Sequence, residues 1–249
     1  EQMAQLKEIE KGEITSRVLP SLFKATDGAA GLETALADIC ERATEAVRDG
    51  IHILIISDRG SSKDLAPIPS LLAVGAVHHH LIREGTRTKV GIVIESGEPR
   101  EVMHFALLMG YGAAAWCPYV AYDTIRKMIR DGMVRDVDEE EALAHYRKAI
   151  DKGVLKVATK MGISTLQSYH GAQIFEAVGL NKAVIDKYFT WTPSRIEGIG
   201  LDILAEEALG RHRFAYDVDL DIVDGLEAGG LYQWRRRGEP HKWNPGTVA

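Results

Sequence analysis

The sequence predicts an α/β fold in which a parallel sheet is assembled from repeated strand–helix units. Short, almost wholly apolar segments that resemble buried strands alternate with longer segments whose apolar residues recur at helical spacing. The connections between these segments are short. Alternation of this kind gives parallel strands with helices packed outside them, so we expect the strand–helix core over residues 32–132. The spacing suits a barrel and a doubly wound sheet equally.

The first unit combines a helix with a buried strand. In the segment 31–50, residues such as Leu32 and Leu36 recur at helical spacing, and Gly50 can end the helix. The next segment, IHILIIS at 51–57, is apolar and rich in β-branched residues. We therefore expect a helix that leads directly into a strand covered on both faces.

The same pattern then repeats along the chain. Prolines stand near the beginning of each following helical segment or just before it, and a glycine stands at its end, as is typical of helix boundaries. These signals predict a helix over 67–85, a strand over 88–96, a helix over 98–112, a strand over 113–119 and a helix over 120–132.

The remaining residues, 133–249, are predicted to be helical and rich in turns. The segment 136–162 begins with charged residues and continues as an amphipathic helix, and the run Glu139–Glu141 suits the first turn of that helix. Asn181 is a good N-cap for a helix that follows it, and the segment 194–216 is predicted as a further helix. The tail, 224–245, is turn-rich, basic and aromatic, which suits contact with an anion or with an acidic domain.

Composition narrows the class of protein. The 249 residues carry a formal charge of −6, which gives no electrostatic reason to expect nucleic acid or anionic membranes as partners. No apolar run approaches the roughly 20 residues of a membrane span. Cys40 and Cys117 form neither a disulfide framework nor a metal cluster by themselves, and a reducing intracellular compartment is expected.

Three adjacent histidines, His78 to His80, fall within the predicted helix 67–85. Consecutive helical residues point about 100° apart, so the three rings cannot converge on one metal ion from a regular helix. We expect one ring to face the sheet, one to lie at an edge, and one to be solvated or at an interface. His104 on the next helix could approach them, but a two-helix metal site is the weaker hypothesis.

Two carboxylates follow neighbouring predicted strands. Asp58 and Arg59 come directly after the first strand, and Glu95 lies at the end of the second. Functional groups of α/β folds gather at these strand ends. The favoured interpretation is structural, with an Asp58–Arg59 pair that orders the loop and caps the next helix. The alternative is an independent α/β-barrel enzyme that uses Asp58 and Glu95 with a metal ion for acid–base chemistry.

The common phosphate, dinucleotide and hydrolase signatures are missing: no GxGxxG, GxxxxGK[ST] or GxSxG motif occurs in the sequence. We therefore assign no catalytic, cofactor-binding or metal-binding residue from motifs.

A resemblance to a known family rests on several long stretches. KVGIVIESGEPREVMHFALLMGYGAAAWCPY, KMGISTLQSYHGAQIFEAVGL, SRIEGIGLDILAEEAL and WRRRGEPHKWNPGTVA resemble the central domain of the large subunit of glutamate synthase. The resemblance runs in register from about Ser21 to the end of the chain. It implies a modified or incomplete TIM-barrel-like domain that occupies residues 1–249.

The resemblance also implies a function. Enzymes of this family make two glutamates from glutamine and 2-oxoglutarate, with electrons from NAD(P)H or ferredoxin. An amidotransferase domain with an N-terminal cysteine nucleophile releases ammonia, and a barrel domain holds FMN and a [3Fe–4S] cluster. The central domain connects the two and helps form the ammonia tunnel. The parent enzyme is an oxidoreductase, and this segment alone is expected to be non-catalytic.

Further expectations follow from that resemblance. The expected partners are the flanking amidotransferase and FMN-binding domains of the same polypeptide. The parent enzyme as a whole could also bind a small subunit or ferredoxin. Neither nucleic acid nor a membrane is expected as a partner. The location is cytoplasmic, or plastid for a plant-type ferredoxin enzyme.

The sequence begins at Glu1, without an N-terminal cysteine, and its two cysteines cannot supply three cluster ligands, so no cofactor is expected in this segment. A flavin-binding module in its own right is a third reading. Loops around Asp58 and Glu95, or the segment 162–173, are expected to contact neighbouring domains.

Overall fold

A computed structural model of the chain describes residues 2–11, 14–217, 229–230 and 234–248. The chain divides into two compact units, Glu1–Tyr216 and Asp217–Ala249. The first unit holds the sheet and the core. Of the second unit the structure describes a short helix, α10 (Pro245–Val248), and turns before it. Of the predicted tail, 224–245, residues 224–228 and 231–233 lie outside the described residues.

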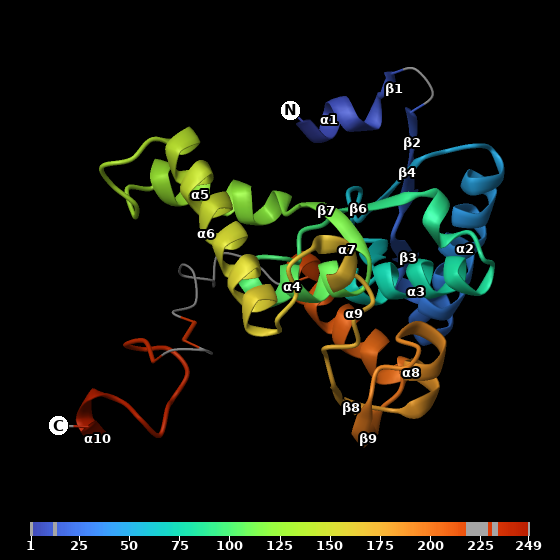
Figure 1. The fold of residues 1–249 in the computed structure, drawn as a ribbon. Helices are drawn as coiled ribbons and strands as arrows, with labels where there is room; N and C mark the ends of the chain where they lie inside the picture. The colour runs from blue at the N-terminus through green and yellow to red at the C-terminus, as the bar shows by residue number, and fades with distance from the viewer. Residues whose placement is uncertain (1, 12–13, 218–228, 231–233, 249) are drawn as a thin grey trace. The chain divides into compact units, whose positions relative to one another are not determined.

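The main sheet confirms the predicted parallel α/β architecture. Its strands lie in the spatial order β1-β2-β4-β6-β7 (Figure 1), where β1 is antiparallel to β2 and the other four are parallel. Spatial order therefore follows sequence order, without the reversal that defines a doubly wound sheet. This is the arrangement of an incomplete barrel. The strands are β1 (Glu10–Lys11), β2 (Ile14–Pro20), β4 (Ile53–Ser57), β6 (Gly91–Glu95) and β7 (Ala113–Cys117).

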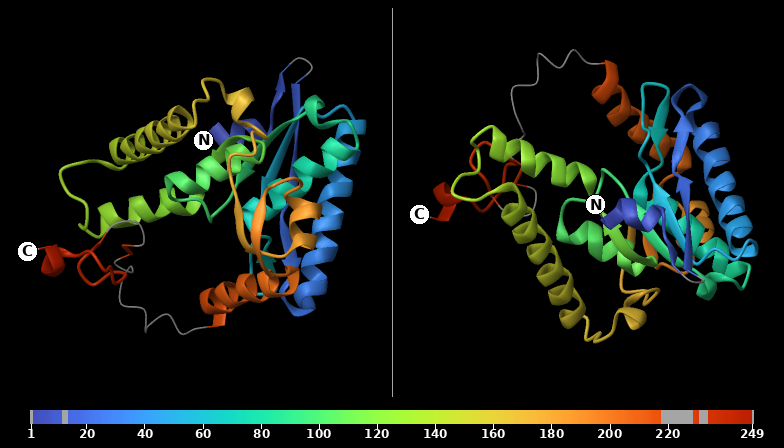
Figure 2. Two further views of the ribbon diagram at one scale, coloured as in Figure 1. Left: turned by 60° about the horizontal axis from the view of Figure 1, so that its bottom comes forward. Right: turned by 90° about the horizontal axis from the view of Figure 1, so that it is seen from above.

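Helices from successive units pack beside one another on the sheet (Figure 2). They are α2 (Gly28–Arg48), α3 (Ser70–Arg83) and α4 (Val102–Gly110). The inward stripe of α2, which includes Leu32 and Leu36, is fully buried against residues such as Leu54 and Ile56 of β4. Burial of this apolar surface, about 25 cal/mol per Å², is the main force that holds helix to sheet.

The first parallel strand, β2, was not predicted. Its sequence, ITSRVLP, mixes polar and apolar residues, unlike the apolar run of β4. It forms a strand because its backbone pairs with β4 from Ser16 to Pro20. Tertiary pairing has outweighed a weak local signal here. The strand–helix core therefore begins near Ile14.

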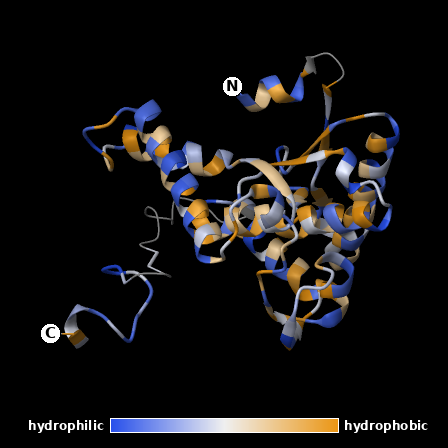
Figure 3. Cartoon of the chain, viewed as in Figure 1, coloured by the Kyte–Doolittle hydropathy of each residue, from blue (hydrophilic) through white to orange (hydrophobic). Residues whose placement is uncertain are grey.

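A helical hairpin follows β7. It consists of α5 (Tyr119–Arg130) and α6 (Glu139–Lys160), and both carry a stripe of apolar residues among hydrophilic ones (Figure 3). Asp138 caps α6 by accepting a hydrogen bond from the backbone N–H of Glu141, so the acidic run occupies the first turn as predicted. A second small core joins α6 to α4 and consists of Phe105, Met109, Ile150, Val154 and Tyr169.

The prediction of a helix over 194–216 was wrong at its start. Residues Ser194–Ile199 form β9, which pairs in parallel with β8 (Ala177–Leu180), and α9 (Leu201–Asp217) begins only afterwards. Gly198 lets the two backbones meet, since a Cβ there would collide with the carbonyl oxygen of Gly179. A glycine inside the predicted helix is therefore a requirement of the strand pair.

Asn181 caps α8 (Lys182–Tyr188) as predicted. Helix α8 packs closely on α3 at Gly75, where a Cβ would lie 2.7 Å from the carbonyl oxygen of Tyr188.

The smaller elements are α1 (Gln2–Lys7), β3 (Leu22–Lys24), η1 (Ala25–Asp27), β5 (Leu65–Pro67), η2 (Arg87–Lys89) and α7 (Leu166–Tyr169). Among the described residues, no helix combines the length and apolarity needed to cross a membrane.

Candidate functional site at the carboxyl edge of the sheet

The carboxyl ends of β4, β6 and β7 bring the predicted carboxylates together. Glu95 ends β6, and Asp58 follows β4, whose last residue pairs with Glu95 in the sheet. The backbone N–H of Asp58 donates to the carbonyl oxygen of Glu95 over 3.2 Å. Both carboxylates are buried, with exposed fractions of 4% and 2%. Buried charge of this kind must be compensated by donors, and the donors define what each group does.

Asp58 organises the loop after β6 and the start of α5. Its carboxylate accepts hydrogen bonds from Ser96 Oγ at 2.6 Å, from the backbone N–H of Gly97 at 3.0 Å, and from the hydroxyl of Tyr119 at 2.7 Å. Burial, together with this hydrogen bond to a carboxylate, raises the pKa of the Tyr119 hydroxyl. Asp58 thus holds three strand ends in a fixed relation.

Glu95 is held by a different set of donors. Its carboxylate accepts from Ser57 Oγ at 2.5 Å, from Lys7 Nζ at 2.7 Å and from Arg59 Nε at 3.2 Å. Burial alone would raise the pKa of Glu95, but the hydrogen bonds and charges of these donors outweigh it, and the net shift is downward. Glu95 is therefore a clamped carboxylate anion that joins α1 to the sheet.

The predicted Asp58–Arg59 pair does not form. The guanidinium of Arg59 bonds instead to Glu95, and it lies 4.0 Å from the centroid of the Tyr119 ring in a cation–π contact. Neighbouring residues of a loop point in different directions, so adjacency in sequence was a poor guide to pairing. The structural interpretation of the loop agrees with these contacts, although the partners differ.

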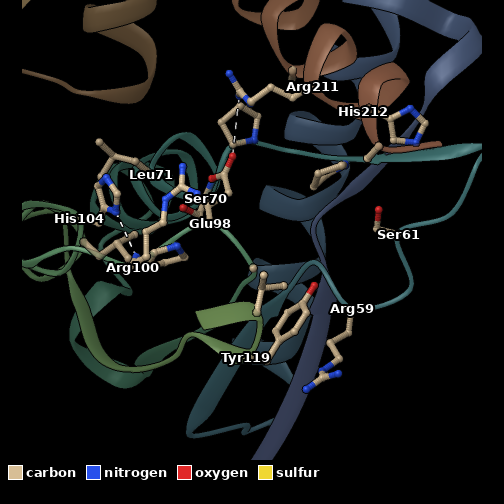
Figure 4. A pocket seen from close by; sticks show the side chains of 18 of the residues that line it. Arg59, Ser61, Ser70, Leu71, Glu98, Arg100, His104, Tyr119, Arg211 and His212 are labelled. Carbon is tan, nitrogen blue, oxygen red and sulfur yellow. Dashed lines mark hydrogen bonds and ion pairs between the residues drawn. The ribbon is translucent and has the colours of Figure 1, made fainter. Parts of the chain in front are cut away.

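An open cavity of about 970 Å³ lies beside these strand ends. Its wall is formed by the loops after β4, β6 and β7 and by one face of α9, and Figure 4 shows the polar side chains that surround it. The lining includes the cations Arg59, Arg100 and Arg211, with Glu98 as its acidic residue, beside apolar side chains such as Leu71 and Leu107. Clefts at this edge are where α/β folds bind ligands and partners.

The three adjacent histidines differ in how deeply they are buried. His78 is 6% exposed, and His79 and His80 are half-buried. His80 Nε2 lies 2.7 Å from Thr44 Oγ1 on α2, so this ring is engaged rather than solvated. Burial lowers the pKa of His78 to about 3 and that of His79 to about 4. Among the residues that the structure describes, no group of three or more His, Cys, Asp or Glu side chains could hold a metal ion.

His104 has a role that sequence reasoning missed. Together with Glu101 it forms a capping box at the start of α4, and its Nδ1 accepts from the backbone N–H groups of Arg100 and Glu101. The Glu-x-x-His spacing was the available signal, because a capping box places its two side chains three residues apart. Lys7 was also missed, since β2, which positions α1, was not predicted.

Comparison with known proteins identifies the family. The family model described as "Glutamate synthase central domain" matches residues 1–181. The chain belongs to this family. The central domain is also 50% identical over 248 residues to the large chain of the NADPH glutamate synthase of Bacillus subtilis, and 41% identical over 229 residues to the NADH glutamate synthase of Schizosaccharomyces pombe. A ferredoxin-dependent, chloroplastic glutamate synthase of Arabidopsis thaliana is 42% identical over 244 residues.

These relatives are much longer proteins. The alignments cover 100%, 91% and 93% of the central domain, but only 16%, 11% and 15% of the respective relatives. The chain therefore spans about a sixth or less of each. Relatives named for NADPH, NADH and ferredoxin all match, so the central domain is common to enzymes with different electron donors in their names.

The cysteines of the central domain do not fit an iron–sulfur cluster. The sequence has two cysteines, fewer than the three that the family's cluster requires. Cys40 is buried in the core on α2, and burial raises the pKa of its thiol to about 11. Cys117 ends β7 and is half-buried, with a pKa that is also raised, mainly by burial. Neither is the low-pKa thiolate that binds metal.

Proposed function

We propose that this chain is the connector of a glutamate synthase, which joins the glutamine amidotransferase domain to the FMN and [3Fe–4S] synthase domain. The whole enzyme would convert glutamine, 2-oxoglutarate and reductant into two glutamates. The observation that carries this proposal is the match of the central-domain family model over residues 1–181. Full-length relatives with "glutamate synthase" in their names support it.

The strand-end contacts support a structural role for the segment itself. Asp58 and Glu95 are the groups best placed for catalysis, yet each is saturated by donors from the protein. Such networks rigidify a fold when fully satisfied. A rigid connector keeps two active sites in fixed relation, so that ammonia can pass between them along a tunnel without equilibrating with water. In this proposal no residue of the segment is catalytic.

The remaining assignments belong to the same proposal. The cofactors sit in the parent's synthase domain, and this segment binds none. Its partners are the two flanking domains of one polypeptide, and residues 1–249 act as one central domain. The location is intracellular, in the cytoplasm or, for enzymes like the chloroplastic relatives, in plastids.

Coupling between the two active sites tests the proposal. In the full-length enzyme, Arg59→Gln at the strand ends and Gln167→Ala in the segment 162–173 are compared with Glu41→Gln, an exposed residue on α2. We expect the number of glutamines hydrolysed per glutamate formed to rise for Arg59→Gln or Gln167→Ala and to stay constant for Glu41→Gln. An unchanged ratio in all three variants would count against a connector role for these surfaces. Flavin or stoichiometric metal in the purified 249-residue chain would count against a cofactor-free segment.

A further inference from the structure

The cavity beside the strand ends has an unbalanced set of charges. Arg59 is paired with Glu95, so its charge is compensated. Glu98 is hydrogen-bonded to the start of α3, where its Oε2 accepts from the backbone N–H of Ser70 at 2.6 Å. Arg211 approaches Glu98 only loosely, with an N–O distance of 3.9 Å. Arg100 has no carboxylate partner among the described residues, which leaves the wall with a positive excess.

His104 adds a directed donor to the same wall. Its Nδ1 accepts two backbone N–H groups, at 3.1 and 3.2 Å, so the neutral ring carries its proton on Nε2. Within the described part of the chain no hydrogen bond joins that Nε2 to another residue, and His104 lines the cavity. Figure 4 shows His104 and Arg100 on the same side of the cavity as Glu98 and Leu71. A carboxylate placed here would receive a hydrogen bond from His104 and a charge-assisted one from Arg100.

Much of the remaining lining is apolar, and the cavity is open. Val120 at the start of α5 and Tyr216 at the end of α9 line it, yet they are 45% and 41% exposed. Aromatic and apolar side chains around arginines are typical of the centres of protein interfaces. A small ligand site would be expected to enclose most of its ligand, whereas this cavity leaves its apolar rim uncovered.

From these observations we propose that the cavity receives an apolar segment bearing a carboxylate, from a part of the same polypeptide outside residues 1–249. In the relatives, the part that matches residues 1–249 makes up only 16% or less of the chain, so the remaining polypeptide is long enough to supply the docking segment. The carboxylate pairs with Arg100 and His104, and the apolar side chains cover Val120 and Tyr216. This inference rests on the proposed connector function and assigns one docking surface to it.

Site-directed photo-crosslinking in the full-length enzyme tests the docking surface. p-Benzoylphenylalanine replaces Val120 at the rim, and in a matched control it replaces Ile82, which is 49% exposed at the opposite end of α3 from the cavity. We expect the Val120 position to crosslink to one sequence outside residues 1–249, within a few residues of an Asp or Glu. Arg100→Glu should lower that yield by about tenfold, and Arg100→Lys should lower it less. The control crosslink should not depend on Arg100.

Several outcomes would overturn the docking proposal. One is a Val120 crosslink confined to residues 1–249; another is a yield that Arg100→Glu leaves unchanged. A third is a stabilisation of the full-length enzyme by citrate or phosphate that disappears with Arg100→Glu, because it would assign the cavity to a small anion. The rise in the glutamine-to-glutamate ratio expected for Gln167→Ala, relative to Glu41→Gln, tests the connector function separately. A raised ratio in Gln167→Ala without the expected crosslink at Val120 would remove this surface and leave the connector in place.

Discussion

Arg87 Nε donates a hydrogen bond to His78 Nδ1 over 2.9 Å, which joins η2 to the buried face of α3. The other guanidinium nitrogens donate to the carbonyl oxygens of Val90 at 2.7 Å and Gly112 at 2.8 Å. One side chain thus connects a helix with the approaches to β6 and β7. Because Nδ1 accepts, the neutral ring of His78 carries its proton on Nε2.

Arg87→Lys should destabilise the chain although it keeps the charge. A single ammonium cannot reach three acceptors that are arranged for a planar guanidinium. Loss of two of these bonds leaves buried acceptors unsatisfied, and we expect a cost of about 2–3 kcal/mol in the free energy of unfolding. Urea unfolding measures this, with Arg83→Lys at an exposed position as the control, where the change should stay within about 0.5 kcal/mol. Equal effects for both variants would contradict the assigned role.

Stability should fall as the pH drops below about 6.5. Burial, first, and the charge of Arg87, next, lower the pKa of His78 to about 3. Between these two values the unfolded chain binds more protons than the folded one, so the stabilisation is fully present above pH 6.5 and is lost toward pH 3. The slope from His78 approaches about 1.4 kcal/mol per pH unit inside this window.

Unfolding curves at several pH values measure that slope. His78→Gln, whose amide can still accept from Arg87, should flatten the profile. His145→Gln, at a side chain that is 67% exposed on α6, should leave the profile unchanged. A profile that neither substitution alters would show that other groups control the acid sensitivity.

Glu95→Gln should lower stability at neutral pH by about 2 kcal/mol, because charge-assisted hydrogen bonds to Lys7 and Arg59 become neutral ones. The folded pKa of Glu95 is lowered despite burial. Its contribution is therefore present above the unfolded value of about 4.3 and is lost as the pH falls through the folded value. The difference between native and Glu95→Gln chains should shrink in acid. A constant difference would contradict the assignment of Glu95 as an anion.

Two helical glycines should respond oppositely to alanine. At Gly75 a Cβ would meet the carbonyl oxygen of Tyr188 at 2.7 Å, so Gly75→Ala must push α8 away from α3 and should cost about 1–3 kcal/mol. At Gly210 on α9 no atom lies within 4 Å of the same Cβ, and Gly210→Ala should stabilise the chain by about 0.5–1 kcal/mol. Thermal unfolding of the two variants measures both signs. Destabilisation by Gly210→Ala would show that α9 packs differently.

Local pattern predicted the elements that are buried on both faces and the helices with clear ends. The strand at Ile53–Ser57, the acidic first turn of α6 and the cap at Asn181 were predictable because propensity, burial and turn chemistry agree there. β2 and β9 were not, since their strand character comes from pairing with distant segments rather than from their own residues.

The candidate site was likewise predictable only in part. Sequence placed Asp58 and Glu95 at neighbouring strand ends correctly. The partners Tyr119 and Lys7 lie 61 and 88 positions away, respectively, in the chain from the carboxylates that they bind, and only the folded sheet brings them close. One cavity wall combines residues that are distant in sequence: Arg100 just before α4, His104 on α4 and Arg211 on α9. No local sequence signal indicates that they lie together.

The strand order of the sheet bears on how the protein is made. A ribosome releases β2, β4, β6 and β7 in the order in which they lie side by side. Each newly synthesised strand therefore adds to the edge left by the one before it, and no strand must wait for a distant one to emerge. Folding can keep pace with translation, which shortens the time that the apolar strands of the nascent polypeptide stay uncovered.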